Sequence, residues 1–165
     1  MKLLGDKANA RALAKRIKVP TVPGSDGILE DDNETIRIAD RVGFPVIIKA
    51  SAGGGGRGMR IVHDKTDLLA AIKQAKQEAD GAFNSRDVYI ERYIDRPRHV
   101  EVQVIADTHG SVVHLFERDC TLQRRHQKLV EESPSPAIDA RTRTDLCACA
   151  VKICKTAKYF SAGTV

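Results

Sequence analysis

The chain has 165 residues, of which 42% are hydrophobic and 30% are charged, and its formal net charge is +5. This length allows one substantial core, or two small lobes that share a nucleotide cleft. No apolar run in the sequence approaches the ~20 residues that span a membrane. The first residues lack the apolar core of a secretory signal, so we expect a cytoplasmic protein.

The positive charge fits nucleic acid as well as ATP or small acidic substrates. The chain contains three tyrosines, four phenylalanines and no tryptophan, which argues against a stacking platform for single-stranded nucleic acid. We therefore expect the excess charge to lie on solvated surface and around a phosphate-binding cleft.

The first half of the chain predicts helices that alternate with strands. Asp6 can cap a first helix, and Pro20 ends it. Its apolar residues recur at helical spacing: Ala10, Leu13, Ala14 and Ile17. A second helix is expected from about Asp32 to Arg41. We expect Asp64 and Asp67 to cap a third helix, after which residues 87–94 read as a strand.

A strand and a glycine loop are the most informative segment of this half. Residues 45–51 contain three consecutive β-branched residues and Lys49, and they lead towards four consecutive glycines, Gly53 to Gly56. Glycine loses more conformational freedom on ordering than any other residue, so such a run is poor material for stability alone. Its bare backbone N–H groups can close around an anion. The segment therefore predicts a flexible phosphate clamp, with a plain glycine-rich hairpin as the alternative.

Two common phosphate-binding motifs do not fit this loop. The pattern G-x-x-x-x-G-K-[ST] aligns Gly53 with Gly58, but Met59 stands where the pattern needs lysine. The pattern G-x-G-x-x-G fits Gly53, Gly55 and Gly58, yet that motif opens a helix. Residues 59–63 are instead short, apolar and strand-like. We therefore expect the loop to join two strands.

The second half predicts an antiparallel hairpin followed by a helix. Residues 99–106 alternate, so that valines face one side and polar side chains face the other. The apolar face comprises Val100, Val102 and Val104, and the polar face comprises His99, Glu101 and Gln103. A turn leads to a partner strand at 112–117. A helix is expected from about residue 140 to 159, and residues 161–165 begin a further strand.

Residues 117–132 are dense in charge of both signs. The carboxylates that flank this segment would repel a nucleic-acid backbone, which disfavours a nucleic-acid patch. Mixed donors and acceptors beside an apolar sheet suit a small polar ligand. A structural network of ion pairs explains the same composition, so the segment leaves both possibilities open.

The cysteines do not form a recognisable metal motif. They are Cys120, Cys147, Cys149 and Cys154. Their spacing does not match the C-x-x-C pairs of zinc sites. The last three follow the helical pattern of the final helix, so we expect them to be small packing residues and predict no metal site there. Unpaired cysteines fit a reducing compartment.

Several ordered segments together resemble one family, the biotin carboxylases, which are the ATP-grasp component of biotin-dependent carboxylases such as acetyl-CoA carboxylase. The segments are Gly5-Asp6-Lys7, Lys49 with 53–59, 89–94, 96–101, 117–132 and 162–165. The resemblance implies a mixed α/β (α+β) ATP-grasp fold that is present in part. Residues 1–20 would be a helix leading into the ATP-grasp region, 21–94 the lid subdomain with its glycine-rich loop at 53–58, and 95–165 the first part of the antiparallel core subdomain.

The resemblance also implies an activity, which is the ATP-dependent carboxylation of biotin on biotin carboxyl carrier protein. Bicarbonate would attack the γ-phosphate of ATP to give carboxyphosphate, and its CO₂ would be captured by biotin. Positioning and charge neutralisation dominate such phosphoryl transfer. The implied cofactors are ATP and Mg²⁺, with biotin as the carried substrate. The resemblance also implies a carboxyltransferase component as partner and a homodimer of the full-length enzyme. For acetyl-CoA carboxylase, this reaction is the first half-reaction and belongs to fatty acid synthesis.

Individual residues match positions of the family motifs. By this resemblance Lys7 and Lys49 would contact the ATP phosphates, and Gly55 and Gly56 would belong to the lid loop. The adenine hinge would comprise Glu91, Arg92, Tyr93 and Ile94. Residues around the ribose and base would be His99, Gln123 and His126. Lys128 would hold bicarbonate or carboxyphosphate.

The family positions that hold Mg²⁺, and the arginines that follow them, correspond to positions after residue 165. The resemblance therefore implies that this chain alone is inactive as a carboxylase, with its metal ligands mostly missing. Two alternatives remain, namely another ATP-grasp ligase of the carbamoyl-phosphate synthetase type, or a non-catalytic basic module that binds RNA. Residues 123–128, Gln-Arg-Arg-His-Gln-Lys, argue against the first alternative.

Overall fold

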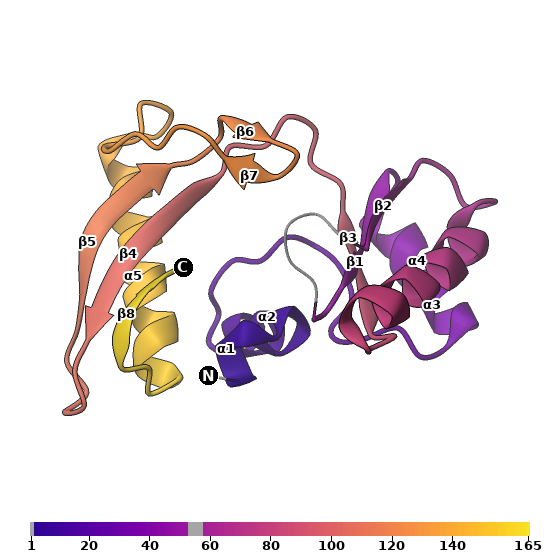
Figure 1. The fold of residues 1–165 in the computed structure, drawn as a ribbon, viewed down its shortest axis with the longest axis horizontal. Coiled ribbons are helices and arrows are strands. Elements are labelled where there is room, and N and C mark those ends of the chain that lie inside the picture. The colour runs from indigo at the N-terminus through magenta and orange to yellow at the C-terminus, as the bar shows by residue number, and fades with distance from the viewer. Residues whose placement is uncertain (1, 53–57) are drawn as a thin grey trace. The chain divides into compact units, whose positions relative to one another are not determined.

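The computed structural model of the chain describes residues 2–52 and 58–165. It forms two compact units, residues 2–95 and residues 96–165 (Figure 1). The predicted lid-loop residues Gly55 and Gly56 lie outside the described residues. Within the described ranges, no helix combines the length and the apolar character needed to cross a membrane.

The unit of residues 2–95 contains a three-stranded antiparallel sheet. Its strands are β1 (Val46–Ala50), β2 (Met59–Val62) and β3 (Val88–Arg92), in the order β2-β1-β3. Lys49 of β1 pairs with Met59 of β2, which confirms that the glycine loop joins two strands. The loop around Gly24 lies directly against β3, because a Cβ atom at Gly24 would come within 2.2 Å of the Ile90 carbonyl oxygen.

Within the described residues four helices accompany this sheet, and one of the two predicted caps is present. They are α1 (Lys2–Gly5), α2 (Lys7–Arg16), α3 (Asp32–Val42) and α4 (Leu68–Phe83). The Asp6 side chain caps α2 by accepting a hydrogen bond from the Asn9 N–H. The predicted capping of α4 is wrong in detail. Asp67 is at the cap position but makes no side-chain cap bond, because its backbone is helical (φ −87°, ψ −11°) rather than extended as in a typical N-cap residue.

Alternation along the strands separates a core face from a polar face. Val46, Ile48 and Ala50 of β1 are buried and join the core formed with α3 and α4. Figure 1 shows α3 and α4 on one side of this sheet and α2 on the other. Lys49 lies on the opposite face from the core, and the register places it across from Tyr89 of β3. Glu91 shares this polar face two residues further along β3.

The unit of residues 96–165 packs one long helix on a second antiparallel sheet. The strands are β4 (Val100–Ala106), β5 (Val112–Asp119) and β8 (Ser161–Thr164), in the order β5-β4-β8. Helix α5 (Ala140–Thr156) covers one face, and a small hairpin joins β6 (Gln123–Arg124) to β7 (Gln127–Lys128). The hairpin at β4 and β5 is as predicted, but α5 ends before residue 159, because Lys158 has a φ of 49° that no helix accommodates.

The core of this unit lies between β4 and α5. Val102 and Val104 contribute from the strand, while Cys147 and Cys154 contribute from the helix, which confirms these two cysteines as packing residues. The alternation expected for β4 is present, since Val102 and Val104 are buried and Gln103 between them is not. A register shift opposite Gln103 places one extra residue in β5, at Leu115 and Phe116. Cys149 is only partly buried.

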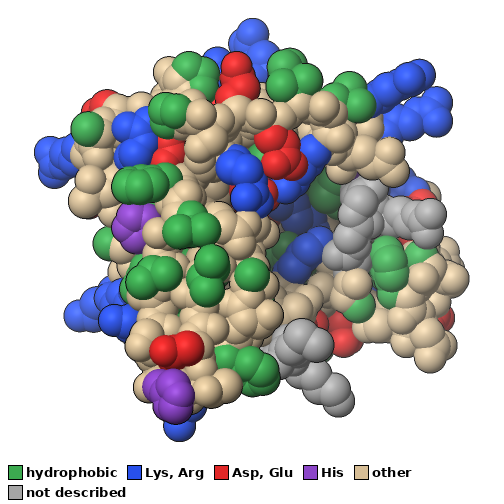
Figure 2. Space-filling model, turned by 60° about the vertical axis from the view of Figure 1, so that its left-hand side comes forward, with side chains coloured by type: hydrophobic (Ala, Val, Ile, Leu, Met, Phe, Trp, Pro, Cys, Tyr) green, Lys and Arg blue, Asp and Glu red, His purple; other side chains and the backbone are tan. Residues whose placement is uncertain are grey.

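The other face of this sheet carries exposed apolar side chains. Ile105 pairs with Val113, and these two side chains are 45% and 55% exposed. Leu115, two residues further along β5, is 54% exposed. Figure 2 turns this side of the molecule forward and shows hydrophobic side chains gathered on its surface. Such a face marks a surface suited to contact with other polypeptide.

Candidate nucleotide and anion sites

Glu91 is the centre of a cationic cluster in the unit of residues 2–95. Lys49 donates a hydrogen bond from Nζ to Glu91 Oε2 at 2.6 Å, and Arg11 of α2 binds the other carboxylate oxygen. The Glu91 side chain is only 8% exposed, so this carboxylate is almost fully desolvated. Arg11 also donates to the carbonyl oxygen of Val22 at 2.9 Å. One buried carboxylate thus holds Lys49 and joins α2 to the sheet.

Lys7 adds a third cation to this cluster. It is the first residue of α2, and the charges of Lys49 and Glu91 both act on it. Burial lowers the pKa of the Lys7 ammonium below its ordinary value, and the positive charge of Lys49 lowers it further. Arg11 and Lys49 thus contact the carboxylate of Glu91, while Lys7 lies near enough for the charges of Lys49 and Glu91 to act on it. This excess of positive charge suits a polyanion such as a nucleotide phosphate chain.

The predicted hinge begins at Glu91, and the protein fixes most of the backbone that follows. Arg92 N donates to the Pro23 carbonyl oxygen at 2.8 Å, and Tyr93 N donates to that of Pro45 at 3.0 Å. The Arg92 guanidinium donates a hydrogen bond to the Val42 carbonyl oxygen, so this side chain links the end of β3 to the end of α3. Within the described ranges the Ile94 N–H has no hydrogen-bond partner, and the Ile94 side chain is 48% exposed. The hinge therefore offers a free backbone donor beside an apolar side chain.

A second cluster surrounds Glu101 in the unit of residues 96–165. The strand register places Arg118 of β5 opposite Glu101 of β4, and Arg118 Nη2 lies 2.5 Å from Glu101 Oε1. Lys128, from the small hairpin, donates to Glu101 Oε2 at 2.5 Å. Glu131 is more exposed; its Oε2 lies 3.3 Å from Arg118 Nε and its Oε1 lies 3.6 Å from Lys128 Nζ. The structural ion network that the sequence left open is therefore present here.

These contacts set the ionisation of the cluster. Burial raises the pKa of Glu101, but the hydrogen bonds and charges of Lys128 and Arg118 outweigh it and hold that pKa below its ordinary value. In return, the hydrogen bond that Lys128 donates to Glu101 raises the pKa of Lys128. Lys128 is therefore a permanent cation, held by a buried carboxylate while 35% of its side chain remains exposed. A cation held in this way suits a small anion.

His99 and Gln123 lie beside this second cluster, whereas His126 is not tied to it. Gln123 Nε2 donates to the Cys120 carbonyl oxygen at 2.8 Å and lies 2.9 Å from His99 Nδ1. His99 Nε2 is 3.8 Å from Glu101 Oε2. His126 is exposed in the turn of the small hairpin, and within the described part of the chain it makes no side-chain hydrogen bond. The structure thus joins three of the four predicted residues of this unit.

Glu101, Cys120 and Glu131 place their ligand atoms within 4.8 Å of one another, close enough to raise the question of a metal. Mg²⁺ demands an octahedral set of oxygen ligands. Here Lys128 and Arg118 already occupy the carboxylates, and burial raises the pKa of the Cys120 thiol. The described residues therefore do not fit a Mg²⁺ site at this position, and the resident cation is the lysine.

Four residues of these clusters escaped prediction: Arg11, Glu101, Arg118 and Glu131. The hairpin register could have revealed Glu101 and Arg118, because they lie opposite each other on the polar face of β4 and β5. Nothing in the sequence marked Arg11, since its partner Glu91 is 80 residues away along the chain.

Comparison with known proteins defines first the class of domain. Residues 6–165 match the family described as "Carbamoyl-phosphate synthase L chain, ATP binding domain". The chain therefore belongs to this family of ATP-binding domains, and the predicted partial ATP-grasp fold is confirmed.

Within this family the chain is similar to biotin carboxylases. It is 52% identical to the biotin carboxylase of Pseudomonas aeruginosa, over 99% of this chain and 37% of that protein. It superposes with a TM-score of 0.94 on a Campylobacter jejuni biotin carboxylase solved as a β-γ-ATP complex, at 50% identity over 99% of this chain and 36% of that one.

A third match is the biotin carboxylase domain dimer of the 2-oxoglutarate carboxylase of Hydrogenobacter thermophilus, solved with MgADP, ADP and bicarbonate. Its TM-score is 0.92 at 50% identity, with coverage of 99% of this chain and 36% of that one. The predicted resemblance to biotin carboxylases is thus confirmed, and the chain spans a little over a third of the length of these relatives.

Proposed function

We propose that the chain supplies nucleotide- and bicarbonate-binding parts of a biotin carboxylase, which uses ATP and bicarbonate to carboxylate biotin on a carrier protein. The observation that carries this proposal is the cluster at Glu91, where Arg11 and Lys49 bind one buried carboxylate and Lys7 adds a third positive charge nearby. The cluster has more positive than negative charge and lies on a sheet face near a free backbone donor. This arrangement favours a nucleotide-binding role over a purely structural ion pair.

The first cluster would bind ATP. Lys7 and Lys49 contact the phosphates in this proposal, and Glu91 keeps Lys49 in place. The Ile94 N–H and the hinge backbone hold the edge of the adenine, whose apolar ring contacts the Ile94 side chain. His99, Gln123 and His126 contact the ribose and base in the same proposal. Gly55 and Gly56 belong to the loop that covers the phosphates.

The second cluster would bind the small anion. Lys128 holds bicarbonate while an oxygen of bicarbonate attacks the γ-phosphorus atom and the bond from that phosphorus to the ADP oxygen breaks. The product, carboxyphosphate, separates into CO₂ and phosphate, and a ureido nitrogen of biotin captures the CO₂. Lys128 neutralises the anion throughout. Mg²⁺ would neutralise phosphate charge when bound, although the carboxylates around Glu101 do not fit it.

Further partners and arrangements belong to the same proposal. Biotin carboxyl carrier protein would bring the biotin, and a carboxyltransferase component would use the product. The full-length protein would form a homodimer and work in the cytoplasm or its organellar equivalent. Residues 1–20, 21–94 and 95–165 would act as entry helix, lid and part of the core. The 165-residue chain alone would bind ligands without carboxylating biotin.

Calorimetric titration of the 165-residue chain with MgATP tests this proposal. We expect saturable binding that Lys49→Met weakens tenfold or more. Lys73→Met removes an exposed lysine of α4 in the same unit and should leave the affinity unchanged. Absence of MgATP binding, or equal affinities of the two variants, would contradict the proposal. Binding of RNA instead, with an affinity that falls steeply as salt is added, would favour the RNA-binding alternative.

A further inference from the structure

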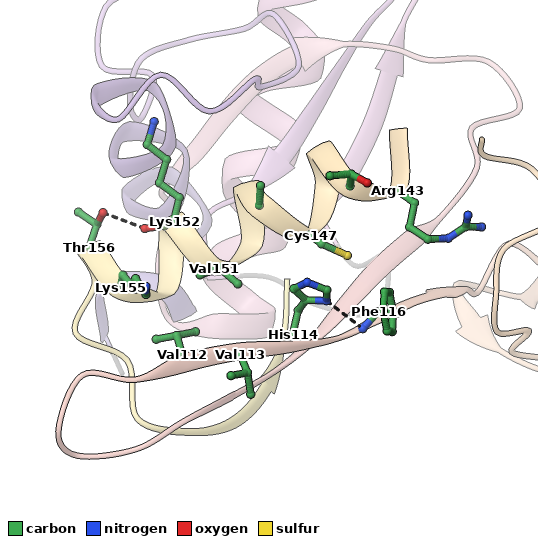
Figure 3. A pocket seen from close by; sticks show the side chains of 12 residues that line it. Val112, Val113, His114, Phe116, Arg143, Cys147, Val151, Lys152, Lys155 and Thr156 are labelled. Carbon is green, nitrogen blue, oxygen red and sulfur yellow. Dashed lines mark hydrogen bonds between the residues drawn. The ribbon is translucent and has the colours of Figure 1, made fainter. Parts of the chain in front are cut away.

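A groove runs along α5 in the unit of residues 96–165, apart from both clusters described above. It has a volume of about 950 Å³ and lies between the helix and the edge strand β5 (Figure 3). Lining residues of α5 extend from Arg143 to Thr156, a stretch of roughly 20 Å at 1.5 Å per residue. A groove of this volume falls in the range that holds small organic ligands.

The floor of this groove is apolar. Val112 and Cys147 are buried members of the core and also line the groove, while Val151 is partly buried beside them. Phe116 lines it with a ring that is 57% exposed. Figure 3 shows Cys147 and Val151 on α5 and His114 and Phe116 on the strand that faces it. An extended apolar chain would remove this surface from water, which is the main source of affinity for such a ligand.

The charged residues of the groove are all cationic. Lys152 and Lys155 line it near the end of α5, and Arg143 lines it near the other end. None of the lining residues in the described part of the chain is acidic, and neither lysine forms an ion pair there. Arg143 is committed to the buried carboxylate of Glu117 at 2.7 Å. The two lysines are therefore the cations that remain for a ligand.

His114 adds an imidazole ring to the lining of the groove. Its Nδ1 accepts a hydrogen bond from the Phe116 N–H at 3.3 Å, so the neutral ring carries its proton on Nε2. The ring also contacts the Phe116 ring edge to face, with centroids 5.0 Å apart. Phe116 has a φ of 61°, a strained conformation for a bulky residue. This pair fixes the aromatic wall of the groove.

From these features we propose that the groove between β5 and α5 binds a monomeric amphipathic anion, an unbranched aliphatic chain that ends in a carboxylate. The tail lies on the floor between Val151 and Phe116, and the carboxylate lies at Lys152 and Lys155. A membrane surface is the other source of this chemistry. The groove favours the free molecule, because its apolar floor includes buried Val112 and Cys147 and does not protrude toward a bilayer.

Titration of the 165-residue chain with dodecanoate, below the concentration at which it forms micelles, tests the proposal. Amide NMR shifts should saturate and map to the lining residues of β5 and α5. The doubly substituted Lys152→Met/Lys155→Met chain should bind at least tenfold more weakly. Ala148→Glu, which places an anion at an exposed lining position, should weaken binding similarly. Arg141→Met removes an exposed cation of α5 outside the groove and should change nothing.

Three comparisons complete the design. Dodecanol and dodecylamine carry the same tail, and equal binding of either would overturn the proposal in favour of unspecific apolar contact. Vesicles of phosphatidylglycerol test the membrane source, and binding to them in preference to dodecanoate would also overturn it. Thermal unfolding of each variant, followed by circular dichroism, shows that the fold is kept. Wild-type affinity in the folded Ala148→Glu chain would equally exclude the proposed groove.

Discussion

At the scale of single residues, both clusters use a buried carboxylate to fix a lysine. Glu91 holds Lys49, and Glu101 holds Lys128, each with a second partner that is an arginine. A lone lysine on a flexible stem has no fixed position, because its side chain keeps much rotational freedom. A desolvated carboxylate removes that freedom at one end of the ion pair. The lysine can then meet an anion without first being ordered.

Glu101→Gln should destabilise the unit of residues 96–165. It removes the negative charge that both Arg118 and Lys128 contact, while keeping the volume of the side chain. We expect a loss of roughly 1–3 kcal/mol in the free energy of unfolding, below the 3–5 kcal/mol of a fully buried pair because the cations are partly exposed. Urea denaturation at neutral pH measures this change.

The pH dependence of that loss follows from the lowered pKa of Glu101. A depressed folded-state pKa stabilises the fold above the ordinary glutamate value of 4.5 and loses its effect as pH falls through the folded value. The difference between wild type and Glu101→Gln should therefore shrink below about pH 4.5. Glu131→Gln is the control, since this exposed carboxylate should contribute under 1 kcal/mol. Equal losses in the two variants would show that burial of Glu101 is irrelevant.

Lys7 should make nucleotide binding sensitive to alkaline pH. Its pKa lies below the ordinary lysine value of 10.5, so its charge disappears at lower pH than that of a solvated lysine. The affinity for MgATP should fall as pH rises toward 10.5, and binding should take up a proton in that range. Lys7→Arg keeps the charge at all these pH values and should flatten the profile. The same slope in Lys7→Arg would place the titrating group elsewhere.

The sequence predicted the cations of these sites better than their partners. Lys7, Lys49 and Lys128 stood in motif segments that resemble one family, so their identification needed no tertiary information. Arg11 and Glu101 owe their roles to burial and to partners 80 and 27 residues away. Such pairings depend on how helices and strands come together, which local pattern and spacing do not specify.

At the scale of elements, the small hairpin of β6 and β7 carries backbone strain. Gln123 pairs with Lys128 and Arg124 with Gln127, so Arg125 and His126 form a two-residue turn. Both turn residues have positive φ, 51° and 63°. Two-residue hairpin turns of this kind favour Asn-Gly, because most other residues resist the left-handed conformation. With this backbone conformation, an Arg-His turn is therefore less stable than an Asn-Gly turn would be.

Arg125→Asn should stabilise the hairpin locally by about 0.5–1 kcal/mol, since asparagine tolerates the left-handed region. Amide hydrogen exchange of residues 123–128 measures this local free energy. Arg124→Asn removes the same charge at a strand position and should give no gain. Faster exchange in Arg125→Asn than in wild type would mean that the arginine side chain stabilises the turn.

The sequence also predicted the main elements, for reasons that differ along the chain. Helices α2 and α3 begin at capping aspartates and show clear apolar spacing, so local signals sufficed. The extra residue in β5 opposite Gln103 and the early end of α5 left no such signal. The extra residue depends on how β5 pairs with β4, which the spacing along one strand does not specify.

At the scale of the whole molecule, each unit has a hydrophobic core and a sheet of its own. Ile48 is fully buried in the first core, and Val104 is 1% exposed in the second. Each core is formed by residues of one unit alone, from Leu29 to Ile90 in the first and from Val102 to Cys154 in the second. A unit with its own core can unfold as a separate cooperative element.

Core substitutions should therefore act on one unit at a time. Ile48→Ala should destabilise the unit of residues 2–95 by about 2–5 kcal/mol, and Val104→Ala should destabilise the other by less, because it removes a smaller volume. Hydrogen exchange should lose protection only in the unit that carries the change. The affinity of the chain for MgATP at the Lys7 and Lys49 site should fall in Ile48→Ala once that unit begins to unfold. Val104→Ala is the matched control and should leave this affinity unchanged. Loss of protection across all 165 residues in either variant would show that the chain unfolds as one element.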